Sequence, residues 1–165
     1  MSDLTSVAER VIQRATKKGA TAADVLIREE DTFAVTVRMS EVETLKQAIS
    51  RGMLLRVFVG KRTAASNSSD LSDAAIDRLV DETVSMAALT SEDESGGLPD
   101  PSLFATNFPN LDLLDSKWEA LPPEQRIDLA VRAESASLKA DKRIVNSEGG
   151  GFDYSRTRTV LGNTS

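Results

Sequence analysis

The chain has 165 residues, no cysteine, no histidine and a formal net charge of −6, from 20 Lys+Arg against 26 Asp+Glu. The missing cysteines exclude disulfides and thiolate metal sites, and the missing histidines remove the commonest general base and zinc ligand. The acidic balance argues against a broad phosphate-binding face, so direct contact with nucleic acid is not expected. No apolar run approaches the roughly 20 residues of a membrane span, and no basic segment with an apolar run opens the chain, which predicts a soluble cytoplasmic protein without a membrane partner.

The first predicted element is an amphipathic helix over residues 4–15, whose apolar side chains recur at helical spacing. Ser2 or Asp3 is its expected cap, and Gly19 its expected stop. Residues 24–30 and 33–37 then show the alternation of two strands.

A strand meander is predicted next. Residues 41–49 are extended, Arg51-Gly52 breaks the strand, and residues 53–59 are almost wholly apolar. Gly60-Lys61 turns the chain, and residues 62–68 return as a strand of small, hydroxyl-rich side chains. This pattern is typical of an antiparallel meander.

The clearest helix signal begins at Ser72, an N-cap residue, with Leu71 placed to contact Ile76. Residues 91–121 are rich in Asp, Ser, Gly and Pro and predict a surface segment whose larger apolar side chains dock onto the body. These side chains are Leu98, Phe104, Phe108, Leu111, Leu114 and Trp118. A third helix opens at Pro122 or Pro123, and residues 143–147 and 152–161 are expected to be extended.

The sequence therefore predicts an α+β fold. We expect a mainly antiparallel sheet of about four to five strands with two to three helices packed on it, followed by the start of a second sheet. The expected division is an N-terminal α/β domain over residues 1–90, the surface segment over residues 91–121, and a helix with the start of a second sheet over residues 122–165. Strands left unfinished at the last residues predict a fragment of a longer protein.

Several clusters of polar residues are candidates for a metal-binding or catalytic site. Asp73, Asp77 and Asp81, with Asp70, share a helix face and resemble a hard-cation site, but a solvated helix face is the favoured interpretation. The acids at residues 29–31 are interpreted as a solvated turn rather than as catalytic carboxylates.

A second group of candidates is equally open to structural explanations. Ser66, Ser68 and Ser69 with Lys61 suggest a Ser/Lys pair, but no strained nucleophile elbow surrounds them, so strand-edge and capping roles are favoured. Four arginines could clamp a carboxylate or phosphate, although ordinary strand positions are favoured; they are Arg38, Arg51, Arg56 and Arg62. Residues 148–151, EGGG, lack the rest of a phosphate-binding motif and are interpreted as a flexible hairpin.

One binding hypothesis concerns the strand at residues 62–68. If this strand lies at the edge of the sheet, its main chain can accept an extended peptide or a partner strand. The residues of this candidate edge are Arg62, Thr63, Ala64, Ala65, Ser66, Asn67 and Ser68.

An ordered set of short motifs runs along the chain: SEVET at residues 40–44, RG at 51–52, RVFVGKR at 56–62 and ASNSSDLS at 65–72. LPDP at 98–101, FAT at 104–106, DLLD at 112–115, NSEG at 146–149 and GNTS at 162–165 extend the set. Together they resemble the N-terminal domain of the TldD/PmbA family, often labelled modulators of DNA gyrase, and are more similar to the PmbA (TldE) branch than to TldD.

This resemblance implies a subunit of a cytoplasmic metallopeptidase that hydrolyses unfolded peptides. In the family, TldD carries a HExxxH motif in its C-terminal half, and the PmbA/TldE partner lacks it and pairs with TldD around a proteolytic chamber. These residues contain no histidine, so the resemblance implies no catalytic, cofactor or metal residue here. Either the motif lies beyond residue 165 or the protein is the partner without metal, and the second reading is favoured.

The resemblance thus implies a non-catalytic scaffold, chamber wall or subunit interface. Zinc or a similar divalent metal is expected in the catalytic subunit, and a TldD-like catalytic subunit or a homodimer partner is the expected companion. The alternative is a peptide- or protein-binding module acting by strand addition, including a regulatory gyrase-related interaction.

Overall fold

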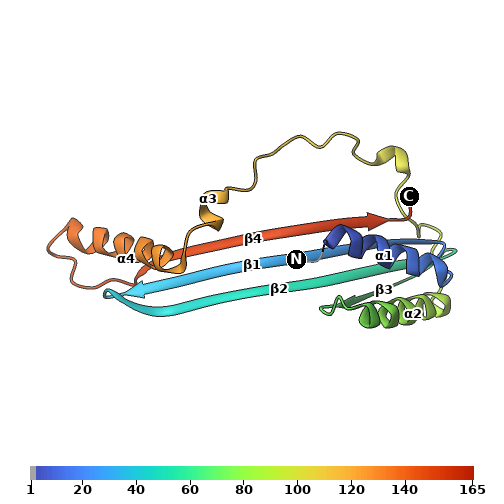
Figure 1. The fold of residues 1–165 in the computed structure, drawn as a ribbon, viewed down its shortest axis with the longest axis horizontal. Coiled ribbons are helices and arrows are strands. Elements are labelled where there is room, and N and C mark those ends of the chain that lie inside the picture. Colours follow the sequence, from blue (N-terminus) through green and yellow to red (C-terminus); the bar gives the residue numbers. More distant parts are fainter. Residues whose placement is uncertain (1–2) are drawn as a thin grey trace. The chain divides into compact units, whose positions relative to one another are not determined.

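A computed structural model describes residues 3–165, and Figure 1 shows its elements. The helices are α1 (Leu4–Lys17), α2 (Asp73–Leu89), the 3-10 turn η1 (Pro101–Leu103), α3 (Ser116–Glu119) and α4 (Pro123–Ala140). The strands are β1 (Ala22–Arg38), β2 (Glu41–Val59), β3 (Arg62–Ser68) and β4 (Gly150–Asn163). The expected α+β fold is confirmed.

The helix boundaries follow the capping signals. The side chain of Asp3 accepts a hydrogen bond from the Thr5 N–H at the start of α1, while Ser2, the alternative cap, lies outside the described residues. The Ser72 hydroxyl accepts from the Ala75 N–H at the start of α2. Pro123 occupies the first turn of α4, where its missing N–H removes no helical bond.

The strands form a single four-stranded sheet in the order β3-β2-β1-β4. Two details of the expectation were wrong. Residues 24–30 and 33–37 belong to one strand, and Arg51-Gly52 does not interrupt β2. These positions are half-buried or exposed, and a strand can continue through polar residues or glycine while its main chain stays paired.

The expected second sheet is also absent from the described chain. β4 joins the same sheet beside β1, and the Thr164 N–H just after it donates to the Ala23 carbonyl at 3.1 Å. Residues 143–147, expected to be extended, form no strand. The partner of β4 is distant in sequence, and such pairing is set by tertiary packing rather than by local pattern.

The chain forms two compact units made of interleaved segments. Unit 1 comprises Met1–Glu29, Ser50–Phe108 and Arg158–Ser165, and unit 2 comprises Glu30–Ile49 and Pro109–Thr157. β1, β2 and β4 each contribute to both units, so the units do not follow the three consecutive ranges that the sequence predicts.

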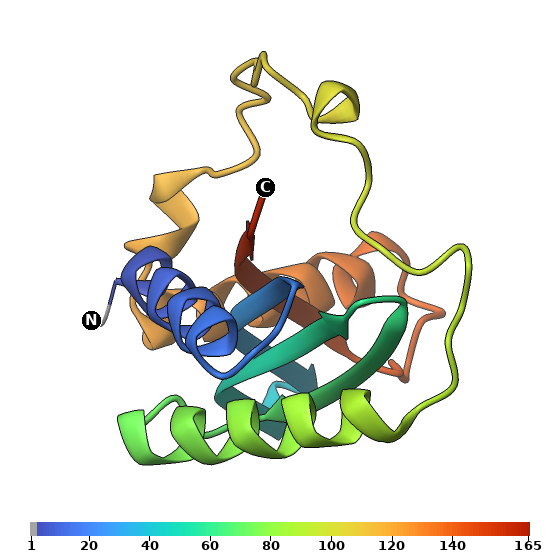
Figure 2. The same cartoon turned by 90° about the vertical axis from the view of Figure 1, so that its right-hand side faces the viewer.

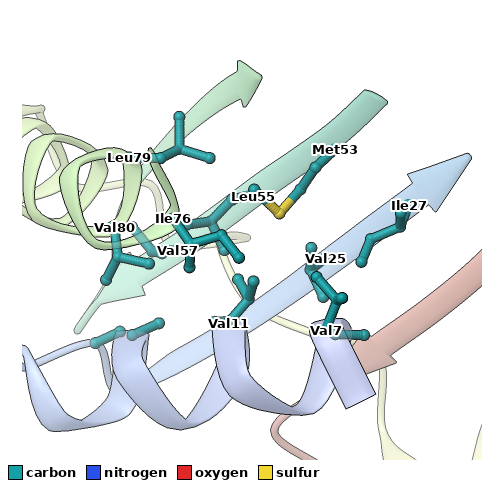
Figure 3. Close-up of a cluster of buried hydrophobic side chains, with 14 of the residues drawn as sticks. Val7, Val11, Val25, Ile27, Met53, Leu55, Val57, Ile76, Leu79 and Val80 are labelled. Carbon is teal, nitrogen blue, oxygen red and sulfur yellow. The ribbon is translucent and has the colours of Figure 1, made fainter. Parts of the chain in front are cut away.

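The core of unit 1 is an aliphatic layer between the sheet and two helices. Figure 2 shows α1 and α2 over the same face of the strands. In Figure 3, Val7 and Val11 of α1 lie against Val25 of β1, and Ile76 of α2 lies near Leu55 of β2. All five side chains are at most 1% exposed. The core of unit 1 is therefore built from closely packed Val, Leu and Ile, as the small number of aromatic residues in the sequence requires.

The core of unit 2 is smaller. Phe33, Val35 and Val37 of β1 are buried together with Ala130 of α4. Half-buried hydrophobic side chains surround them: Ile127, Val131, Phe152 and Tyr154. Such a small apolar cluster depends more on its polar contacts, which are described below.

The segment over residues 91–121 is less firmly docked than expected. Leu98 and Phe104 are half-buried, but Phe108 is 82% and Leu111 66% exposed. Trp118 keeps 46% of its surface exposed. The docking expectation was therefore wrong for Phe108 and Leu111, and also for Leu114, which is 54% exposed.

None of the helices between residues 3 and 165 combines the length and apolar character needed to cross a membrane.

Candidate functional site

The candidate peptide-accepting strand, β3, lies at an edge of the sheet and pairs antiparallel with β2 alone. Arg62 stands opposite Val59, and Ser68 stands opposite Met53. The two-residue turn at Gly60 and Lys61 fixes this register, and Gly60 adopts a φ of 62°, a value that glycine reaches without strain.

Only part of this edge is open. The Thr63 carbonyl accepts a hydrogen bond from the Thr90 hydroxyl at 3.1 Å, so it points away from β2. Main-chain direction alternates along an antiparallel strand, so Ala65 and Asn67 also point outward. The Lys61 carbonyl accepts from the Asp93 N–H at 2.9 Å. The C-terminal end of α2 and the residues after it therefore cover the start of the edge. The outward main-chain groups of Ala65 and Asn67 remain open.

The aspartate row of α2 has a structural role that the sequence reading missed. Arg14 of α1 contacts Asp73 at 2.7 Å and Asp77 at 3.3 Å, and Lys18 contacts Asp81 at 2.7 Å. The basic residues of α1 and the acids of α2 share a four-residue spacing, so the facing helices form a ladder of ion pairs. The carboxylates remain exposed to solvent, as expected, and are in addition compensated by cations of α1.

These residues do not fit a peptidase zinc site. Such a site is built from imidazole and carboxylate ligands, and the chain has no histidine. Within residues 3–165 no group of three or more metal-ligating side chains comes close enough to hold an ion.

The structure separates the other catalytic candidates. Seven residues of extended chain place Lys61 and Ser68 about 23 Å apart, and the Ser68 hydroxyl bonds the main chain of Asp70 at both its N–H and carbonyl. The acids at residues 29–31 lie inside β1 rather than in a turn, so the expected turn was wrong.

The four arginines do not form a shared clamp, because three have separate partners. Arg56 pairs with Asp24, Arg62 with Glu92 at 3.5 Å, and Arg38 with Glu43 at 3.7 Å. The interpretation as individual strand residues fits these contacts better than a common anion site.

A buried carboxylate in unit 2 was not found by sequence reasoning. Glu134 of α4 is 1% exposed, and its two oxygens accept from the N–H groups of Met39 and Ser40 at 2.7 and 2.8 Å. These residues form the β1–β2 turn with positive φ angles of 50° and 68°. The bond from the Ser40 N–H is the main reason that the pKa of Glu134 lies below its ordinary value, assisted by Met39, Ser147 and Arg38 against the opposing effect of desolvation.

Gly150 serves the same packing, and residues 148–151 do not form the expected hairpin. A Cβ on Gly150 would collide with the Ala130 carbonyl and lie 2.8 Å from the Glu134 nitrogen. β4 can therefore start against α4 only with glycine at this position. The sequence signal for this close packing is the run of glycines before the strand. The run does not indicate which helix lies opposite the strand.

Residues 23–87 match a family model described as PmbA/TldA metallopeptidase domain 1. The chain is 36% identical over 142 residues to Metalloprotease PmbA of Escherichia coli O157:H7, covering 86% of this chain and 31% of that protein. It is 32% identical over 153 residues to the Metalloprotease PmbA homolog of Haemophilus influenzae, covering 93% of this chain and 33% of that protein. The chain thus spans about a third of the length of these relatives.

Two solved structures share the fold. A putative modulator of DNA gyrase from Bacteroides thetaiotaomicron superposes with a TM-score of 0.81 at 23% identity, over 99% of this chain and 36% of that one. TldE from Thermococcus kodakarensis superposes with a TM-score of 0.76 at 17% identity, over 96% and 35%.

Proposed function

Because the chain belongs to the PmbA/TldD family and carries its first domain, we propose that it is the N-terminal, non-catalytic part of a metallopeptidase subunit. In this role it forms scaffold, chamber wall or subunit interface for the hydrolysis of unfolded peptides. The observation that carries the proposal is the 36% identity to Metalloprotease PmbA across 86% of this chain.

The groups that hydrolyse the peptide bond then belong to other residues of the assembly. This part of the proposal is supported by the sequence, which supplies no imidazole for the expected zinc or similar divalent metal. A TldD-like catalytic subunit or a homodimer partner provides them, and the assembly works in the cytoplasm.

A role at a subunit interface is supported by exposed apolar side chains. Leu103, Phe108 and Leu113 are 77%, 82% and 86% exposed. All three belong to the segment over residues 91–121, and large exposed apolar side chains are a feature of interaction sites.

The test is a hydrolysis assay with an unfolded substrate, fluorescently labelled β-casein. We expect no hydrolysis by this chain alone, and hydrolysis when the full-length subunit is combined with a TldD-type subunit of the same source. Chelator-sensitive hydrolysis by the purified 165-residue chain would contradict a non-catalytic role.

A second candidate function is capture of a peptide or partner strand at β3. The open main-chain groups of Ala65 and Asn67 favour it, because a sheet edge offers unpaired donors and acceptors to an extended segment. The covered positions at Lys61 and Thr63 limit the proposed contact to this short part of the strand.

Two proline substitutions separate an open edge from a structural strand. Ala65→Pro removes an outward N–H and should abolish capture with little change in melting temperature, whereas Ala64→Pro removes an N–H directed to β2 and should lower the melting temperature clearly. Unfolding of the Ala65→Pro variant, or unchanged capture by it, would count against strand addition here.

A further inference from the structure

Unit 2 has a surface pocket that the sequence reading did not anticipate. Its volume is about 400 Å³, within the roughly 300–1,000 Å³ that ligand pockets occupy. One wall is formed by residues 152–155 of β4, and the other by Leu113, Leu114, Asp115 and Trp118.

The pocket has an aromatic wall. The ring centroids of Trp118 and Phe152 are 6.0 Å apart, and Phe152 in turn meets Phe33 edge-on at 6.4 Å. Trp118 remains 46% exposed, so part of its ring is accessible to a ligand.

Arg126 stabilises the main chain of this wall. Its side chain donates to the carbonyls of Leu121, Trp118 and Glu119 at 2.8, 3.2 and 3.3 Å. Its guanidinium also lies 4.8 Å from the ring centroid of Tyr154. Arg126 is 8% exposed, so these contacts fix the main chain that carries Trp118 and the pocket is largely preformed.

The pocket lies at the open edge of β4. Side chains alternate between the two faces of a strand, yet four consecutive residues, 152–155, line the pocket. This arrangement occurs where a cavity reaches around the strand edge, and β4 is the outermost strand on its side of the sheet. An extended peptide lying along this edge could therefore place a side chain in the pocket.

The charges around the pocket favour a cation. Asp115 and Asp153 both line it. The Asp153 side chain makes no hydrogen bond or ion pair within residues 3–165, and one Asp115 oxygen is used by the Lys117 N–H at 3.0 Å. Of the nearby cations, Arg156 is paired with Glu119. An aromatic face beside carboxylates that keep free oxygens is the chemistry that binds a basic side chain.

We propose that this pocket receives a Lys or Arg side chain of an extended peptide lying along β4. The inference rests on the proposed peptide-handling function and deepens it by naming the kind of segment that this domain holds. Basic segments are retained by the pocket, and acidic segments are repelled by the two carboxylates.

Binding can be followed directly because Trp118 is the chain's single tryptophan. The probes are short capped peptides of alternating threonine and valine with Lys, Arg, norleucine or Glu at the central position. Titration should change Trp118 fluorescence, with the Lys and Arg peptides binding about tenfold more tightly than norleucine, from a cation–π contact plus an exposed ion pair. The advantage should shrink at high salt.

Asp153→Asn should weaken binding of the Lys peptide about threefold, as expected for one exposed ion pair, and leave binding of norleucine unchanged. Glu124→Gln is the matched control, because it removes an acid of α4 that does not line the pocket. Equal binding of Lys and norleucine, preference for Glu, or no binding of any probe would overturn the inference. None of these results tests the peptidase-subunit proposal, which is tested separately by the casein assay.

Discussion

The two units of this chain are stabilised in different ways. Unit 1 buries a long series of aliphatic side chains from α1, α2 and the strands between them. Unit 2 buries four hydrophobic residues and adds two charged side chains, Arg126 and Glu134, whose partners are mainly main-chain groups. The comparison teaches that a small apolar core can be supported by buried charges when main-chain groups hold each charge by hydrogen bonds.

The largest expected effect is loss of volume in unit 1. Leu55 is 0% exposed, so Leu55→Ala should destabilise the protein by about 3 kcal/mol and lower the melting temperature by about 6–12 °C. Leu54→Ala is the control, since Leu54 is 46% exposed. Circular dichroism during thermal unfolding measures both, and similar losses in the two variants would contradict this account of unit 1.

The next effect tests the packing of β4 against α4 in unit 2. Gly150→Ala should destabilise unit 2 by about 1–3 kcal/mol, since the new Cβ meets main chain that cannot move aside. Hydrogen exchange should quicken in α4. Gly151→Ala is the matched control, because the nearest atom to its Cβ would be the Val35 carbonyl oxygen at 3.6 Å. An unaffected Gly150→Ala variant would disprove the close approach.

The buried acid of unit 2 should make stability depend on pH. The pKa of Glu134 is lowered in the folded state from its ordinary 4.5, so its contribution is complete above that value and is lost as the pH falls through the lowered pKa. The Glu134→Gln variant should therefore have a lower free energy of unfolding than the wild type at pH 7. This difference should narrow as the pH falls below 4.5. Urea unfolding across this range measures it, and a difference independent of pH would refute the role of the charge.

The smallest effect concerns the ion-pair ladder of unit 1. Asp77 is 58% exposed in its side chain, so Asp77→Asn should cost at most about 1 kcal/mol. This loss should disappear in 1 M salt, where the Debye length is about 3 Å. A larger loss that persists in high salt would show that the ladder does more than pair exposed charges.

The sequence by itself determined the local elements of this protein. Asp3 and Ser72 mark the helix starts, and the apolar spacing of α1 and α2 predicts which faces are buried, because caps and periodicity depend on neighbouring residues. The antiparallel pairing of β2 with β3 follows from the Gly60-Lys61 turn and the short connection, whereas the edge position of β3 follows from the order of the strands in the sheet.

The tertiary structure alone decided which distant groups meet. It joined β4 to β1 in one sheet, placed Arg14 and Lys18 opposite the aspartates of α2, and covered the start of the β3 edge with Thr90. It also brought Glu134 to the turn at Met39 and Ser40. These contacts join residues far apart in the chain, and they depend on backbone approach and hydrogen-bond geometry that no local pattern records.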